Sequence, residues 1–232
     1  MKLSLSALKE KTFWQDADIA VPAYDVSAMA ERTKASPAWV HFGAGNIFRG
    51  YIAKLQNNLL NSGFAEKGIV AVDSSDGYQL EKVYKPFDNL TMLVSLYADG
   101  SSKKEVIASI AEAVHADWNK PDQLARLKEI FVSPSLQLCS FTITEKGYAI
   151  RSSDGAFLPA VAADLENGPS SLKNVMAKVT ALLLERYNAG GFPMAVVSMD
   201  NCSHNGEKLR AGVTEMAREW LKKGYVPEGY VA

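Results

Sequence analysis

The sequence predicts an α/β fold with a doubly wound, mostly parallel sheet. Three observations predict it: short apolar runs that suit buried strands, amphipathic stretches of about 10 to 15 residues between them, and two glycines, Gly43 and Gly45, where the first strand meets the first long helix. A chain of 232 residues is also long enough to bury a sizeable core. Strands and helices that alternate in this way form open sheets with right-handed crossovers.

The first part of the chain changes character near residue 37. Residues 1–36 are expected to form an irregular arm with one short helix near 27–34. An apolar run then predicts a strand at Trp39–Phe42, and Asn46 suits the N-cap of a helix that ends near Asn61–Gly63. One apolar stripe of this helix should pack on the sheet: Ile47, Phe48, Tyr51, Ile52, Leu55, Leu59 and Leu60.

The remaining elements follow from the same patterns. Segment 105–114 is ambiguous between strand and helix, and its β-branched residues favour a strand. Residues 151–170 are rich in turn formers, so a loop is expected there. The other strands are expected at 69–73, 91–97, 136–143 and 194–198, and the other helices at 121–131, 171–189 and 205–222.

Composition excludes several classes of function. The chain has 25 basic and 26 acidic residues and a net charge of −1, so it has no basic field for nucleic acid or an acidic membrane surface. Cys139 and Cys202 belong to no metal-binding or disulfide pattern, and no metal is expected. The first residues lack the apolar core of a signal peptide, and no apolar run approaches the ~18 residues of a membrane span, so a cytoplasmic protein is expected.

The glycine turn and the acid after the next strand carry the first chemical signal. Two glycines before a helix leave its N-terminal amides open to a pyrophosphate, although Phe48 stands where a third glycine is usual. Asp73 can accept hydrogen bonds from the ribose hydroxyls of an adenosine and would repel a 2′-phosphate. No Arg or Lys occurs in 74–80, which favours NAD over NADP. A tight turn at 43–46 and a capping role for Asp73 remain the alternatives.

Two further polar segments follow strands. Residues 142–148, TITEKGY, and residues 198–206, SMDNCSHNG, lie where the carboxyl ends of parallel strands bind ligands. The Asn201 amide could donate to a carbonyl or alkoxide, which would polarise a reacting oxygen. His204 is the obvious general base, yet a histidine in the first turn of a helix usually faces solvent. A polar turn without a ligand is the alternative for residues 142–148.

Together, HFGAGNIFRG at 41–50, TITEKGY and SMDNCSHNG resemble the polyol-specific long-chain dehydrogenase family, which includes mannitol 2-dehydrogenases and D-mannonate oxidoreductases. The resemblance implies a Rossmann-type NAD-binding domain over 37–232, followed in the family by a helical substrate domain that this chain is expected to lack. It implies a catalytic role for Asn201 as the polarising amide. It implies cofactor contacts from Gly43, Gly45 and Asp73, and we expect further contacts from Ala44, Asn46, Ile47, Phe48, Thr144 and Glu145.

The resemblance also reveals a departure. The family's catalytic lysine precedes an asparagine by five positions and a histidine by eight, but at that distance before Asn201 and His204 stands Val196. The chain is therefore expected to bind NAD(H) without supplying the base that moves the substrate proton. The expected function is hydride transfer between NAD(H) and a sugar acid or polyol, with D-mannonate/D-fructuronate first. An NAD(H)-sensing module and an S-adenosylmethionine-dependent methyltransferase remain open, and the sequence carries no signal of oligomeric state.

Overall fold

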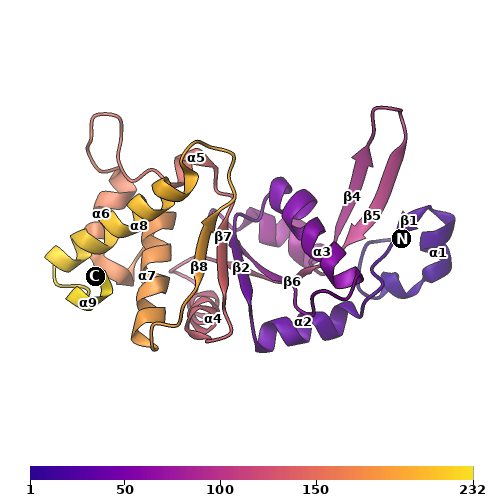
Figure 1. The fold of residues 1–232 in the computed structure, drawn as a ribbon, viewed down its shortest axis with the longest axis horizontal. Coiled ribbons are helices and arrows are strands. Elements are labelled where there is room, and N and C mark those ends of the chain that lie inside the picture. Colours follow the sequence, from indigo (N-terminus) through magenta and orange to yellow (C-terminus); the bar gives the residue numbers. More distant parts are fainter. Residues whose placement is uncertain (232) are drawn as a thin grey trace. The chain divides into compact units, whose positions relative to one another are not determined.

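A computed structural model describes residues 1–231, which form two compact units, Met1–Val114 and the part from His115 onward. The first unit holds the helices α1 (Lys11–Asp16), α2 (Val26–Ala35) and α3 (Ala53–Asn61), the short helical turns at Ala7–Lys9, Phe48–Ile52, Leu80–Tyr84 and Lys85–Phe87, and the strands β1 (Ile19–Ala20), β2 (Trp39–Phe42), β3 (Ile69–Asp73), β4 (Thr91–Leu96), β5 (Ser102–Ile107) and β6 (Ile110–His115) (Figure 1).

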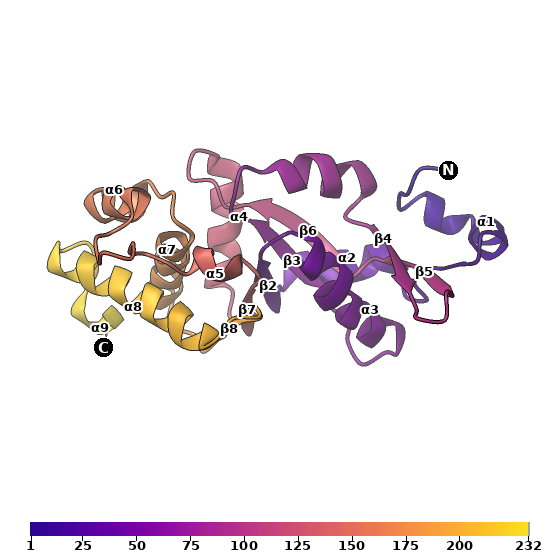
Figure 2. The ribbon, with the colours of Figure 1, turned by 90° about the horizontal axis from the view of Figure 1, so that it is seen from above.

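The second unit contains fewer strands and more helix. Its elements are α4 (Pro121–Val132), β7 (Leu138–Phe141), α5 (Thr144–Gly147), α6 (Pro159–Asn167), a short turn at Gly168–Ser170, α7 (Val175–Asn188), β8 (Ala195–Ser198), α8 (Asn205–Lys222) and α9 (Glu228–Val231). Helix α7 packs against both α4 and α8 (Figure 1, Figure 2). In residues 1–231, no helix is both long and apolar enough to span a membrane.

Parallel strand pairs form the sheets of both units, as the alternating pattern predicts. In the first unit β6, β3 and β2 are neighbours in that order, and β2 and β3 run parallel with Val40 opposite Val70. In the second unit β7 and β8 run parallel with Leu138 opposite Ala195. Every residue of β3 is buried, as expected for a strand covered on both faces. The carboxyl ends of β2 and β3 therefore lie side by side, and so do those of β7 and β8.

The ambiguous segment at 105–114 does form strand, but it divides between two sheets. Residues up to Ile107 belong to β5, which pairs with β1 and antiparallel with β4, whereas Ile110 begins β6 beside β3. The break falls at Ser109, whose carbonyl accepts a 2.9 Å hydrogen bond from the Ile69 amide. The β-branched content therefore predicted the type of element correctly and could not locate the break.

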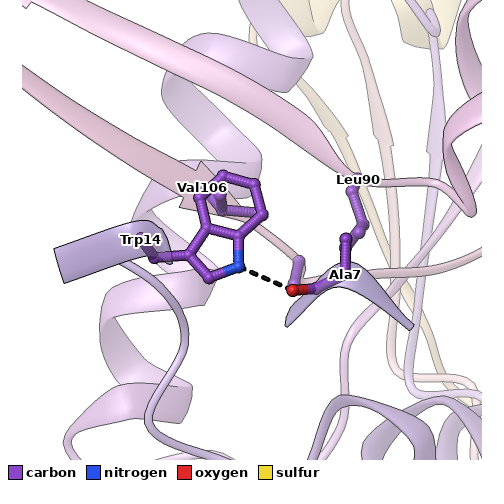
Figure 3. Packing of buried hydrophobic residues seen from close by; sticks show 5 residues of the cluster. Ala7, Trp14, Leu90 and Val106 are labelled. Atoms are coloured by element: carbon purple, nitrogen blue, oxygen red, sulfur yellow. Dashed lines mark hydrogen bonds between the residues drawn. The ribbon is translucent and has the colours of Figure 1, made fainter. Parts of the chain in front are cut away.

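The N-terminal arm is more ordered than its sequence suggests. Besides the expected helix α2, it contains α1, and Trp14 of α1 is buried. Figure 3 shows the Trp14 indole nitrogen donating its hydrogen bond to the Ala7 carbonyl, with Val106 against the ring and Leu90 beside Ala7; the donor–acceptor distance is 2.7 Å. These contacts anchor the arm to the rest of the first unit.

Two helix expectations were wrong. The loop expected at 151–170 contains α6, which Pro159 opens from the first helical position. The stripe expected on the helix after Asn46 is divided: Phe48, Ile52 and Leu60 are buried, whereas Ile47 is 67 % exposed. Tyr51, Leu55 and Leu59 are likewise exposed. The helix makes a five-residue π turn at Phe48–Ile52 before α3 begins. Its buried face runs on through the polar Gln56 and Asn57, whose side chains bond to the Lys67 carbonyl and the Ala108 amide.

Arg186 organises the second unit from inside. The residue lies on α7 and is only 3 % exposed, so its guanidinium must find its hydrogen-bond acceptors within the protein. It donates to five backbone carbonyls, those of Phe131, Ser133, Leu136, Phe192 and Pro193, at 2.7–3.1 Å. One side chain thus ties the end of α4, the start of β7 and the segment before β8 to α7.

Arg186→Lys should lower the free energy of unfolding by about 2–4 kcal/mol, because an ammonium cannot reach five carbonyls from one fixed plane and several would stay buried without a donor. Urea titration followed by circular dichroism measures the change. Arg218→Lys, an exposed arginine on α8, is the control and should stay within ~0.5 kcal/mol of the unaltered chain. Equal stabilities for the two variants would contradict the account.

His41 makes the first unit sensitive to acid. It is fully buried in β2 and stacks on the Phe48 ring with centroids 4.3 Å apart. Burial lowers the pKa of His41 from 6.5 to about 3, so the folded chain holds the imidazole neutral. The unfolded chain binds a proton below its ordinary pKa and the folded chain does not. Stability is therefore complete above pH ~6.5 and is lost as the pH falls below it.

Between pH 6 and pH 4, the unfolding free energy should fall by about 1.4 kcal/mol per pH unit through His41 alone. A His41→Gln variant should lack this part of the slope, whereas His204→Asn, which alters an exposed histidine, should keep it. Urea titrations at intervals of half a pH unit provide the comparison. Identical slopes for the unaltered chain and His41→Gln would show that His41 does not couple folding to protonation.

Candidate functional site

The turn after β2 has the backbone that an anion site requires. Gly43 has a φ of 117°, a conformation that residues with side chains rarely adopt, and its amide donates to the Val72 carbonyl at 3.0 Å. This bond ties the turn to the neighbouring strand β3. At Gly45, no heavy atom lies within 4 Å of the place where a Cβ would stand. One side of the turn is therefore open to a bound group.

The helix after the turn begins at Asn46. Its first backbone bond runs from the Arg49 amide to the Gly45 carbonyl at 3.1 Å, so Gly45 and not Asn46 occupies the N-cap position. The Asn46 side chain instead accepts a hydrogen bond from the Arg49 guanidinium. The amides of Asn46, Ile47 and Phe48 precede the first helical bond and have no partner inside the helix. The Phe48 ring lies in the core, so only its backbone can serve a ligand.

Tyr84, which the sequence patterns did not single out, fixes the turn from below. Its hydroxyl donates to the Ala44 carbonyl at 2.9 Å, and the ring is 1 % exposed. Burial raises the pKa of Tyr84 above its ordinary value, the Arg49 charge opposes this rise, and the Asp73 charge adds to it. Tyr84, Arg49 and Asp73 thus share one neighbourhood, and the phenol stays protonated to hold the Ala44 carbonyl away from the open side.

Asp73 ends β3 with one carboxylate oxygen in use and one unused. It is 2 % exposed, and Oδ1 accepts hydrogen bonds from the Ser75 amide at 2.9 Å and the Ser75 hydroxyl at 2.6 Å. Oδ2 is buried and has no hydrogen-bond partner among the described residues, and the same holds for Nε of Arg49. A buried carboxylate oxygen without a donor is costly. A ligand hydroxyl at this point would satisfy it.

In the second unit, the segments that follow β7 and β8 meet. The Asp200 carboxylate accepts the Ile143 amide at 2.9 Å and the Thr144 amide at 3.1 Å. It also accepts the Tyr148 hydroxyl at 2.6 Å. Thr144 has a φ of 65°, in the left-handed region that a β-branched residue rarely enters. The two polar segments found in the sequence are therefore one connected structure.

The other predicted residues of this unit are more exposed. The Glu145 carboxylate forms an ion pair with Lys208, which lowers the Glu145 pKa. Both residues line a groove of about 360 Å³ together with Tyr148. Asn201 is exposed at the end of the turn after Asp200, where its amide is accessible to a ligand.

His204 lies exposed at the N-cap of α8. Its side chain is 72 % exposed, and Nδ1 lies 3.3 Å from Oε2 of Glu207 on the same helix. It starts α8 in the left-handed conformation, with a φ of 54°. In residues 1–231, no group of three or more His, Cys, Asp or Glu side chains is arranged to hold a metal ion.

Comparison with known proteins agrees with this description. Residues 37–228 match the family model described as the mannitol dehydrogenase Rossmann domain. The chain is 44 % identical to the D-mannonate oxidoreductase of Thermotoga maritima over 231 residues, which is 100 % of this chain and 43 % of that protein. It is 33 % identical to the polyol:NADP oxidoreductase of Gluconobacter oxydans, covering 93 % of this chain and 45 % of that protein. The chain thus spans less than half the length of these relatives.

Solved structures show the same architecture. A substrate-free D-sorbitol dehydrogenase matches with a TM-score of 0.77 and 28 % identity, over 96 % of this chain and 45 % of that one. The Pseudomonas fluorescens mannitol 2-dehydrogenase, in a ternary complex with NAD and D-mannitol, matches with a TM-score of 0.79 and 28 % identity, over 97 % of this chain and 44 % of that one. The predicted family resemblance and the Rossmann-type α/β fold are both confirmed. The chain belongs to the mannitol dehydrogenase family, and residues 37–228 match its Rossmann domain.

Proposed function

We propose that this chain binds NAD(H) and forms the cofactor half of an oxidoreductase that acts on a sugar acid or polyol, with D-mannonate/D-fructuronate as the first substrate pair. The observation that carries the proposal is the buried, unpartnered Oδ2 of Asp73 beside an open glycine turn. The 44 % identity to a D-mannonate oxidoreductase supports the choice of substrate pair. A bound nicotinamide would supply the hydride chemistry.

The residues of the first unit fit an adenosine diphosphate group. The open side of Gly45 leaves room for a pyrophosphate, and the free amides of Asn46 and Ile47 can donate to its oxygens at a helix N-terminus. Oδ2 of Asp73 can accept a ribose hydroxyl, which would replace the hydrogen bond that this oxygen lacks. The glycine turn and Asp73 can therefore bind two neighbouring parts of the same cofactor, its pyrophosphate and its ribose.

The acidic surroundings of the ribose position favour NAD over NADP. Asp73 ends β3, and no Lys or Arg occurs in 74–80, the segment that follows it. A 2′-phosphate would face like charge in a partly desolvated place. The alternative is a preference for NADP, because one relative at 33 % identity is named a polyol:NADP oxidoreductase.

In the second unit, we assign Asn201 the polarising role and Thr144 and Glu145 contacts to the cofactor. An amide does not titrate, so Asn201 can donate to a substrate oxygen without removing its proton. The proton would pass to a base that this chain does not supply, because His204 is exposed and turned to Glu207. Cys139 and Cys202 are both free thiols, which suits a reducing cytoplasm.

Gly45→Ala should weaken NADH binding at least about tenfold without lowering the melting temperature. The added methyl group meets nothing in the free chain, yet it would occupy the space proposed for the pyrophosphate. Fluorescence titration with NADH and a thermal melt measure the two effects. Gly50→Ala, in the following π turn with only an ordinary 3.6 Å contact to Leu93, is the matched control and should bind NADH normally. Unchanged NADH binding by Gly45→Ala would exclude this turn.

Asp73→Ala should narrow the preference for NADH over NADPH by about tenfold, because it removes the like charge near a 2′-phosphate. Titrations of both cofactors against the unaltered chain, Asp73→Ala and the exposed-acid control Asp76→Ala give the comparison. S-adenosylmethionine, added as a competitor, should not displace NADH. If the unaltered chain binds NADPH as tightly as NADH, the role given to Asp73 is wrong.

A further inference from the structure

Asp200 joins three parts of the second unit through one side chain. Oδ2 accepts the Ile143 amide at 2.9 Å and the Tyr148 hydroxyl at 2.6 Å, while Oδ1 accepts the Thr144 amide at 3.1 Å. The Tyr148 hydroxyl also lies 2.7 Å from Oγ of Ser198, the last residue of β8. The carboxylate therefore binds the two amides at the start of α5 and, through the Tyr148 hydroxyl, is connected to the end of β8.

The backbone of Asp200 holds the following turn as well. Its carbonyl accepts the Cys202 amide at 3.0 Å and Nδ2 of Asn205 at 2.8 Å. These bonds close the chain into a turn that contains Asn201, which lies between Asp200 and both donors in the sequence. Asp200 is thus bonded both to the Thr144 backbone and to the turn that contains Asn201.

Thr144 needs such a partner. With a φ of 65°, it is held in a conformation that costs a β-branched residue on the order of 1–3 kcal/mol. Strain of this kind persists only where surrounding bonds fix the backbone. The two adjacent amides bound by one carboxylate, those of Ile143 and Thr144, provide that restraint. Without it, the turn would relax toward an ordinary backbone conformation.

We propose that Asp200 is a positioning residue of the cofactor-binding rim, the name used here for Thr144 and Glu145. Its carboxylate holds Thr144 in the left-handed conformation that NAD(H) binding requires. The inference rests on the proposed function, since it concerns the same rim. It assigns Asp200 no contact with cofactor or substrate.

Asp164 offers a control for the loss of a carboxylate that accepts loop amides. Like Asp200, it lies in the second unit and accepts two successive loop amides, those of Lys173 at 3.0 Å and Asn174 at 2.7 Å. It is on α6, and neither amide belongs to a segment that follows a strand of the parallel pair. Asp164→Asn should therefore destabilise the fold in a similar way without reaching the rim.

The experiment measures NADH affinity by fluorescence titration of the full chain in four forms beside the unaltered one: Asp200→Asn, Asp164→Asn, Thr144→Gly, and Asp200→Asn with Thr144→Gly. Thermal melts of every form identify a temperature at which all forms are folded, and the titrations are run at that temperature. Asp200→Asn should bind NADH about tenfold more weakly, the size of effect expected for a lost charge-assisted hydrogen bond. Asp164→Asn should bind within about twofold of the unaltered chain.

Thr144→Gly distinguishes a positioning role of Asp200 from a general contribution to stability, because only a positioning role makes the effect of Asp200→Asn depend on residue 144. Glycine adopts a positive φ without strain, so in its background the carboxylate has less to hold. The loss caused by Asp200→Asn should then shrink from about tenfold to about threefold or less. A tenfold loss in both backgrounds overturns the inference, as does an Asp200→Asn affinity equal to that of Asp164→Asn. If the unaltered chain fails to bind NADH, it is the proposed function that fails.

Discussion

A carboxylate oxygen that is buried without a donor is the constraint on which the first unit's site depends. Asp73 ends a strand that is buried along its whole length, so its side chain is removed from water. Ser75 satisfies one oxygen from the next turn and cannot reach the other. Leaving such an oxygen unpaired costs about 1–3 kcal/mol. A ligand whose hydroxyl donates a hydrogen bond to this oxygen would therefore remove that cost, which adds to its binding free energy.

In the same unit, hydrogen bonds hold the backbone of the glycine turn in place before a ligand binds. The Gly43 amide is bound to β3 and the Ala44 carbonyl to Tyr84, so the turn between them cannot swing its carbonyls toward an incoming anion. Because His41 and Phe48 stack beneath the turn, its strand and its helix are also held together. Preorganised amides of this kind bind an anion without first rearranging. In the second unit, the Asp200 carboxylate holds the strained backbone at Thr144 in a similar way.

Features that depend on local sequence were predictable. Strand β2, the glycine turn, the fully buried β3 and the acid at its end all follow from apolar runs and turn formers, and α8 appears at its expected bounds. Tyr84 and Asp200 were not predictable in their roles, because they act on residues 40 and 56 positions away. The exposed half of the helix stripe was not predictable because the buried face includes Gln56 and Asn57, polar residues that an apolar period does not count. Helix α6 was missed because turn formers around it outweighed its short apolar period.

The central claim is that NAD(H) binds with its pyrophosphate on the glycine turn and its ribose on Asp73. Nuclear magnetic resonance of the isotope-labelled chain, titrated with NAD⁺, tests it most directly because it reports on each backbone amide. The account predicts that the largest shifts in the first unit fall on the amides of Gly45, Asn46 and Ile47 and on those of Asp73 and Ser75. Saturable binding that leaves these amides unmoved would contradict it.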